Sequence, residues 1–511
     1  MILQKHLKIK SMLSLLLTCT LAVLLFLEFS SFICQLLRGF FGENSIFAPL
    51  LNAESSLFYA SSSIAPLSTT LLMFSWLPLI IFKHFLKGRF KSNLNSKANS
   101  LHEISSFIRL PLEKASKPSF FNRNHQFIAV FSLMSVLLIT VYPYLPALNP
   151  SEKFVGVDIP FYEKKLVELK SLGDFPSIVS AAFFHTPDRP LSILLLFFTW
   201  RLTWLSALEA AQFSPIILGL ILILCTFLFA RLLRFNFFSA SLIMLFTSFS
   251  FHVTVGMYGG FIANWIALIF LYAFWGFIFV ALKRKIWSYC LPAVVLQGLL
   301  MFSHVDTWAM SMGILFILFL LFLADWISKR SNNFEWLMLL CVLVCGILLN
   351  MLRNNFLNVN LGNIEAAEVA KTSLSLGNLL MFWHILNVSL ISYKGISFMN
   401  PILFILAFIG SLAIVFNDDL VSKIFKAFII ASAFPFLLGD QIMQTRIMYN
   451  LPLQIFASLG LYTLTVLVNL YFEPKEATKL NKLLVLLVVF VNLNYALRCS
   501  FHLTTINFFP E

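Results

Sequence analysis

The chain has 511 residues, of which 59% are apolar and only 12% are charged, and its mean hydropathy is +0.88. Soluble domains carry roughly 45–50% apolar and about 25% charged residues. So much apolar surface cannot be hidden inside a water-soluble globule, which excludes a cytosolic enzyme, a disordered chain and a small disulfide-stapled domain. Long unbroken apolar runs also argue against a membrane β-barrel, whose strands alternate. The composition therefore predicts an all-α polytopic membrane protein.

The net charge of +13 comes largely from one segment. Residues 83–123 hold nine Lys or Arg against two Glu. A basic segment next to a span normally lies on the cytoplasmic side and contacts anionic lipid head groups. We therefore expect the lipid bilayer as a partner and no nucleic acid. The seven cysteines show no CxxC spacing and predict neither a disulfide framework nor a metal cluster.

A bilayer core requires roughly 20 apolar residues per helix, and about thirteen stretches meet this requirement. They are 12–32, 65–86, 126–147, 213–231, 237–255, 261–282, 286–303, 308–327, 335–352, 399–416, 424–438, 449–471 and 482–499. Two further apolar stretches, 190–207 and 377–392, carry polar interruptions, so whether they cross the membrane stays open.

Basic residues at the span ends predict the orientation of a multi-pass protein in the cell membrane. Lys5, Lys8 and Lys10 place the N-terminus in the cytoplasm, ahead of a retained anchor helix. If 190–207 lies along the outer surface, then Arg231 and the basic loops at 283–285 and 329–330 also fall inside. We therefore place 190–207 on the outer surface. The same reasoning makes 377–392 a surface or re-entrant helix.

The predicted organisation has three parts. Residues 1–87 form a two-helix N-terminal membrane anchor, and 88–125 form a basic cytoplasmic linker. Residues 126–511 form the transmembrane body, with a first outer loop at 148–212 and a second large outer loop at 353–398.

The first outer loop is unusually rich in charge, and Asp158 is its most informative residue. Gly156 frees the backbone before this acid, and Pro160 ends the extended run after it. Residues 161–171 then predict an amphipathic surface helix with Phe161, Leu166, Val167 and Leu169 on its apolar face. A carboxylate held at the lipid–water boundary can accept a proton from an attacking hydroxyl or hold a metal ion. The alternative is that the loop is polar simply because it is exposed.

Four stretches resemble motifs of the GT-C class of membrane glycosyltransferases: Gly156–Tyr162, Thr186–Leu191, Gly259–Asn264 and Arg446–Pro452. The resemblance covers about 126–471 and implies a GT-C-like body. Such enzymes move a sugar from a polyprenyl-phosphate-linked donor to an acceptor on the outer face. By this analogy Asp158 is the general base or acceptor-orienting acid. The Trp-Trp-Asp signature is absent, which excludes the oligosaccharyltransferase catalytic subunit.

The remaining candidates are substrate-binding residues: Tyr162, Asp188, Arg189, His304, Asp306 and Arg446. By the analogy Arg446 faces the donor phosphate; its alternative role is an ion pair with Asp440. Asp188 and Arg189 can instead neutralise each other. His304 and Asp306 are ionisable residues near a span end, and burying such residues at membrane depth is costly, which suggests a function. The alternative is an interfacial turn in which Asp306 caps the next helix.

Three functions remain open from the sequence. The first is a glycosyltransferase using a lipid-linked donor, with an unknown acceptor. The second is a transporter or lipid flippase, which requires polar residues along a path through the bilayer centre, whereas these spans are nearly charge-free. The third is a non-catalytic membrane protein of the same fold. No DxD pair is present, so the cofactor stays unknown and no metal ligand is assigned.

Overall fold

The computed structural model describes residues 2–42, 125–328, 333–357, 401–438 and 449–505. Within these ranges the chain forms helices and no strand. Nine of the described helical segments are long and apolar enough to cross a membrane. This confirms a polytopic all-α membrane protein. The predicted span 65–86, the predicted non-crossing stretch 377–392 and the basic segment 83–123 lie outside the described residues.

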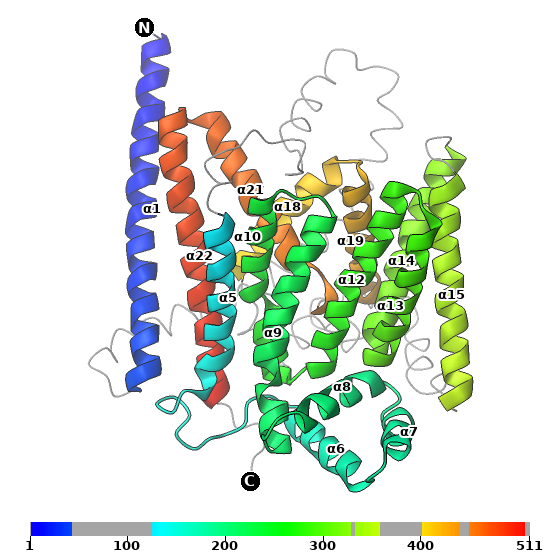
Figure 1. Cartoon of the computed structure of the whole chain (residues 1–511). Helices are drawn as coiled ribbons and strands as arrows, with labels where there is room; N and C mark the ends of the chain where they lie inside the picture. Colours follow the sequence, from blue (N-terminus) through cyan, green and yellow to red (C-terminus); the bar gives the residue numbers. More distant parts are fainter. Residues whose placement is uncertain (1, 43–124, 329–332, 358–400, 439–448, 506–511) are drawn as a thin grey trace.

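The helices assemble into a bundle with a layer of short helices at one end (Figure 1). In chain order they are α1 (Ile2–Phe41), α5 (His125–Val141), η4 (Tyr142–Tyr144), α6 (Ile159–Ser171), α7 (Phe175–His185), α8 (Pro190–Arg201), α9 (Ala207–Leu232), α10 (Phe237–Ser248), α11 (Phe251–Gly259), α12 (Ile262–Arg284), η5 (Trp287–Tyr289), α13 (Cys290–Ser303), α14 (Val305–Ile327), α15 (Asn333–Leu357), α18 (Pro401–Phe416), α19 (Leu420–Leu438), α21 (Leu453–Tyr471) and α22 (Pro474–Thr505).

The uncertain stretch 190–207 forms α8, which has only 12 residues. At 1.5 Å per residue it is about 18 Å long, too short to cross a bilayer core of roughly 30 Å. It lies with α6 and α7 across the ends of the spans (Figure 1). This agrees with the prediction that 190–207 does not cross the membrane. We call this end of the bundle the site end.

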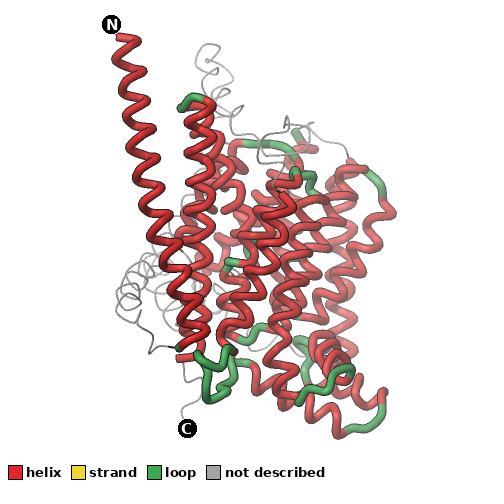
Figure 2. Tube along the Cα trace, turned by 60° about the vertical axis from the view of Figure 1, so that its left-hand side comes forward, coloured by secondary structure: helices red, strands yellow, loops and turns green. Residues whose placement is uncertain are grey.

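The first helix packs along the last one (Figure 2). Asn494 on α22 donates to the Glu28 carboxylate on α1 at 2.7 Å, and Arg498 donates to the Ser31 hydroxyl at 3.0 Å. Polar contacts of this kind join helices in lipid, where apolar surfaces gain little from leaving the solvent.

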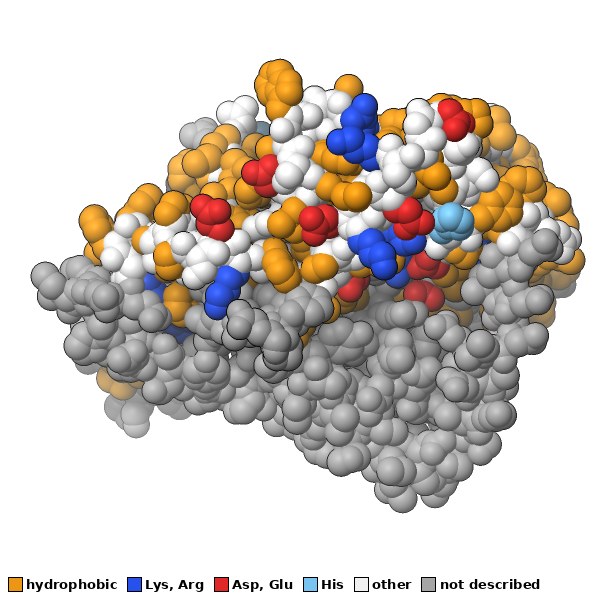
Figure 3. Space-filling view, turned by 90° about the horizontal axis from the view of Figure 1, so that it is seen from below, with side chains coloured by type: hydrophobic (Ala, Val, Ile, Leu, Met, Phe, Trp, Pro, Cys, Tyr) orange, Lys and Arg blue, Asp and Glu red, His pale blue; other side chains and the backbone are white. Residues whose placement is uncertain are grey.

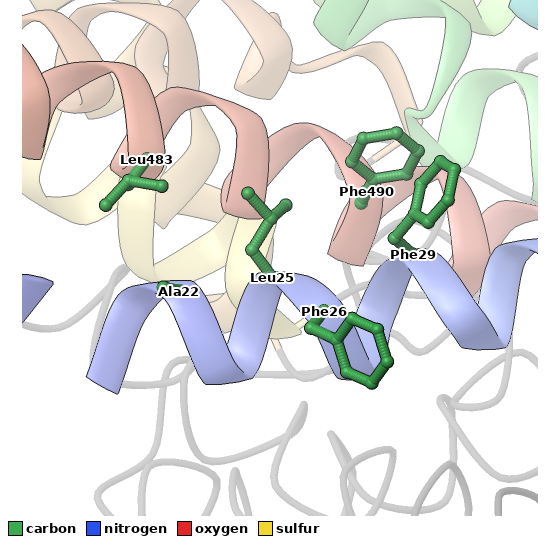
Figure 4. A pocket seen from close by; sticks show the side chains of 6 residues that line it. All are labelled: Ala22, Leu25, Phe26, Phe29, Leu483 and Phe490. Carbon is green, nitrogen blue, oxygen red and sulfur yellow. The ribbon is translucent and has the colours of Figure 1, made fainter. Parts of the chain in front are cut away.

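A shallow groove runs between α1 and α22 beside these contacts (Figure 4). The rings of Phe29 and Phe490 meet edge to face with centroids 5.3 Å apart, whereas Phe26 points away from α22. The groove is lined by apolar side chains and faces the lipid side of α1, which buries little of its surface. The groove is therefore part of the lipid-facing surface.

The centre of the bundle is a span made of two helices. The predicted span 237–255 forms α10 and α11, which meet at Phe249 and Ser250 and are buried from Phe238 onward. Trp265 on α12 and Tyr449 donate to the His252 carbonyl at 2.7 and 2.8 Å. These bonds fix α12 against α11, and buried backbone oxygens in a membrane require such partners.

Helices α18 and α21 cross in direct backbone contact. A Cβ at Gly410 would lie 1.9 Å from the Phe456 carbonyl oxygen, and one at Gly460 would lie 1.9 Å from the Leu406 carbonyl oxygen. Small residues permit this approach, and in lipid close packing supplies much of the energy of helix association. The α18–α21 contact therefore depends on two facing glycines.

We expect Gly460→Ala to lower the thermal stability of the detergent-purified protein, because the added methyl group forces α21 away from α18. Overpacking of this kind typically costs about 1–3 kcal/mol. Gly298→Ala on α13 is the matched control, since its Cβ would meet no atom within 4 Å. Equal melting temperatures for the two variants would contradict the proposed contact.

Candidate functional site

The layer of α6, α7 and α8 carries most of the predicted site residues. Seen from this end, the molecule shows acidic and basic side chains close together among apolar ones (Figure 3). Such density is notable in a chain with only 12% charged residues. The site is built where this layer meets the start of α12.

Backbone pairing holds the Asp158 loop against the end of α11. The amides of Val157 and Asp158 donate to the carbonyls of Tyr258 and Gly259 at 3.0 and 2.9 Å. Gly156 takes a φ of +121°, which favours glycine, and a Cβ there would lie 3.0 Å from the Met257 carbonyl oxygen. The stretches 156–162 and 259–264, which carried the resemblance, are therefore direct neighbours.

The Asp158 carboxylate lies next to a cation. Asp158 stands at the N-cap position of α6, but its side chain makes no capping hydrogen bond to that helix. Arg189 Nη1 lies 3.9 Å from Asp158 Oδ2, and Arg189 Nε lies 2.5 Å from Asp188 Oδ2. The Asp158 and Arg189 side chains remain 36% and 22% exposed, so both border the solvent. The expected Asp188–Arg189 pair is present, and it includes Asp158 as a third charge.

Tyr162 links this cluster to α12. Its side chain is fully buried, and its hydroxyl accepts from the Ala263 amide at 3.1 Å and from Arg189 Nη1 at 3.5 Å. Burial raises the pKa of Tyr162 although Arg189 opposes this, so the phenol stays neutral. Burial lowers the pKa of Arg189, but Tyr162 and Asp188 outweigh it and raise that pKa above its usual range. Arg189 is therefore a permanent cation that α6 and α8 hold in place.

The predicted apolar face of α6 is correct in part. Leu166 and Leu169 are buried as expected, together with Ile159 and Tyr162, whereas Phe161 and Val167 are exposed. The Tyr162 hydrogen bond to α12 lies on the buried face. The exposed Phe161 ring forms a cation–π contact, because the Arg189 guanidinium carbon lies 5.3 Å from its centroid.

His304 and Asp306 are joined to the cluster through the backbone. The amide of Val305 donates to the carbonyl of Asp188 at 3.2 Å. His304, rather than Asp306, caps α14: its side chain accepts from the amide of Thr307. The prediction of an Asp306 cap is therefore wrong, and Asp306 lies in the first turn with Oδ2 3.9 Å from His304 Nε2. Both remain at the border of the site.

Arg446 and Asp440 lie outside the described residues, so their predicted roles stay predictions. The stretch that follows is described from Tyr449. There Asn450 accepts from the Thr307 hydroxyl at 3.1 Å, beside the α13–α14 turn. Across the described ranges no group of three His, Cys, Asp or Glu could hold a metal ion.

Sequence reasoning missed one buried cation near the site, Arg353 on α15. Its guanidinium donates to the carbonyl of Pro187, the residue before Asp188. The signal was an isolated Arg directly after the predicted span 335–352. An ionisable residue at the edge of a span is a functional candidate by default.

An apolar groove shares two helices with the charged cluster, although none of the charged residues of the cluster lines it. It is formed by α8, α9 and α12 and has a volume of about 300 Å³. On α12 its lining runs from Ile262, next to Ala263, to Phe270, which at 1.5 Å per residue is about 12 Å. Leu196 and Trp200 line it on α8, which begins directly after Arg189. Two helices therefore carry both a site residue and the groove.

No protein-family model matches the chain, and no curated protein matches its sequence. The function is therefore inferred from the residues and their geometry.

We expect Gly156→Ala to destabilise the protein by about 1–3 kcal/mol through the positive φ, with a further loss from contacts of 2.9–3.1 Å around the added methyl group. Gly173→Ala is the control, because this glycine also has a positive φ but open space around it. Thermal unfolding compares the two variants. Equal losses would show that the contacts of the Asp158 loop with α11 do not matter for stability.

Proposed function

We propose that this protein transfers a sugar from a polyprenyl-phosphate-linked donor to an acceptor at the outer face of the membrane. The observation that carries the proposal is the Asp158 carboxylate beside the Arg189 guanidinium. Helix α8, which begins directly after Arg189, also lines an apolar groove. The resemblance of four sequence stretches to GT-C glycosyltransferases supports the same reaction.

Each group has a distinct role in this reaction. Asp158 accepts the proton of the acceptor hydroxyl as its oxygen attacks the anomeric carbon. The bond from that carbon to the phosphate oxygen breaks, and the prenyl phosphate leaves with its electron pair. Arg189 offsets the negative charge that develops on the leaving phosphate. A single displacement inverts the anomeric centre.

The groove suits the prenyl chain of such a donor. Its lining is almost entirely apolar, and pockets for small ligands typically begin at about 300 Å³. A chain lying along α12 places its head at Ile262, next to the amide that binds the Tyr162 hydroxyl. A lipid substrate can therefore keep its tail in the groove and its phosphate beside Arg189.

We expect Asp158→Asn to reduce sugar transfer by about 10²–10⁴-fold, the usual contribution of a general base. Prenyl-phosphate release is measured in proteoliposomes supplied with a panel of prenyl-phosphate hexoses and with membrane glycans as acceptors. Asp174→Asn in the same layer is the control, because Asp174 caps α7 and asparagine caps equally well. Full activity of the Asp158 variant would remove this residue from the catalytic role.

We expect Ile217→Trp to raise KM for long-chain prenyl donors about tenfold, a loss of about 1.4 kcal/mol in binding, while short-chain donors are less affected. Ile217 lines the groove on α9, and the larger ring fills it. Leu228→Trp is the matched control, since Leu228 is comparably exposed on α9 but does not line the groove. The same KM change in both variants would exclude the groove as the chain site.

A further inference from the structure

Arg353 is a second buried cation beside Asp188 and Arg189. It is 2% exposed, and its Nη2 donates to the carbonyl of Pro187. Its Nη1 lies 3.4 Å from Asn354 Oδ1, and its Nε has no hydrogen-bond partner. Among the described residues no carboxylate forms an ion pair with it. A guanidinium is thus buried against neutral oxygen atoms, which is costly unless a negative group acts on it.

Asp188 and Arg189 directly follow Pro187. The Asp188 carboxylate receives the Nε of Arg189 at 2.5 Å, and Asp158 Oδ2 lies 3.9 Å from Arg189 Nη1. The hydrogen bond of Arg353 to the Pro187 carbonyl therefore acts on the turn that carries the Arg189 guanidinium.

Contacts from neighbouring helices fix the turn that carries these charges. The amide of Val305 donates to the Asp188 carbonyl at 3.2 Å. The rings of Phe184 on α7 and Phe356 on α15 lie with centroids 6.0 Å apart. Arg353 supplies the charged contact, and it holds the turn from the side of α15.

We propose that Arg353 is a positioning residue for the binding of a phosphate group by Arg189. It holds the Pro187 carbonyl from the side of α15 and so fixes the turn from which the Arg189 guanidinium extends into the site. This inference rests on the proposed function, because it takes the phosphate of the lipid donor as the ligand.

The test measures binding of farnesyl phosphate and of uncharged farnesol to the full-length protein in lipid nanodiscs. Arg353→Gln is expected to weaken farnesyl phosphate binding about tenfold, or about 1.4 kcal/mol, and to leave farnesol binding unchanged. Arg353→Lys keeps the charge and is expected to restore most of the affinity. Asn355→Ala, at an exposed position on the same helix, is the control and is expected to change neither ligand.

Unchanged farnesyl phosphate binding in Arg353→Gln would overturn the proposal. An equal loss of affinity for farnesyl phosphate and farnesol, together with a lower melting temperature, would also overturn it, because that result indicates a purely structural role. If inorganic phosphate competes with farnesyl phosphate, free phosphate is a sufficient ligand. If it does not compete, the ligand is the lipid head group. Either result supports the proposal, provided that farnesyl phosphate binding depends on Arg353. Asp158→Asn is expected to retain farnesyl phosphate binding, because Asp158 acts in the transfer step. If the protein binds the phosphate in a manner that depends on Arg353 but transfers no sugar, the proposed transferase function is refuted and the proposed role of Arg353 is not.

Discussion

The pairing of the Asp158 loop with the end of α11 is the constraint on which the site depends. The amides of Val157 and Asp158 bond to two consecutive carbonyls, 258 and 259, at the point where a buried span ends. Gly156 and Gly260 permit this approach, because a Cβ at either position would lie 3.0–3.2 Å from the backbone of the other segment. The Asp158 loop is thereby attached to the most buried span of the bundle, which holds the carboxylate in place.

Composition predicted the fold class, because every span in lipid must satisfy its backbone hydrogen bonds internally and present an apolar surface. The sequence also predicted that α8 does not cross the membrane, because a crossing there would have placed the following basic loops on the outer side. The Asp158 loop was found because glycine and proline mark its bends. What the sequence did not give were contacts between distant positions. The Tyr162 hydroxyl meets the Ala263 amide 101 positions away, on the face of α6 that also buries Ile159, Leu166 and Leu169.

Arg353 and His304 illustrate two further limits of prediction. The partner of Arg353 is the Pro187 carbonyl, 166 positions away, and a backbone oxygen leaves no signal in a sequence. His304 caps α14 although Asp306 stood nearby with a stronger cap preference. The carbonyl of Asp188 accepts from the amide of Val305, and α14 starts at this residue, two residues earlier than with an Asp306 cap. In both cases tertiary contact outweighs local propensity.

The turn between α8 and α9 presents apolar side chains next to the groove. Trp204 is fully exposed there and Leu202 nearly so, which is unfavourable in water but typical of side chains at the lipid–water interface. Trp200 and Leu205 flank this turn and line the groove together with residues of α9 and α12. Helix α8 thus joins the groove to Arg189, which directly precedes it. The proposed reaction at a phosphate linked to a long chain fits this arrangement, because the tail can stay in the groove while the head reacts.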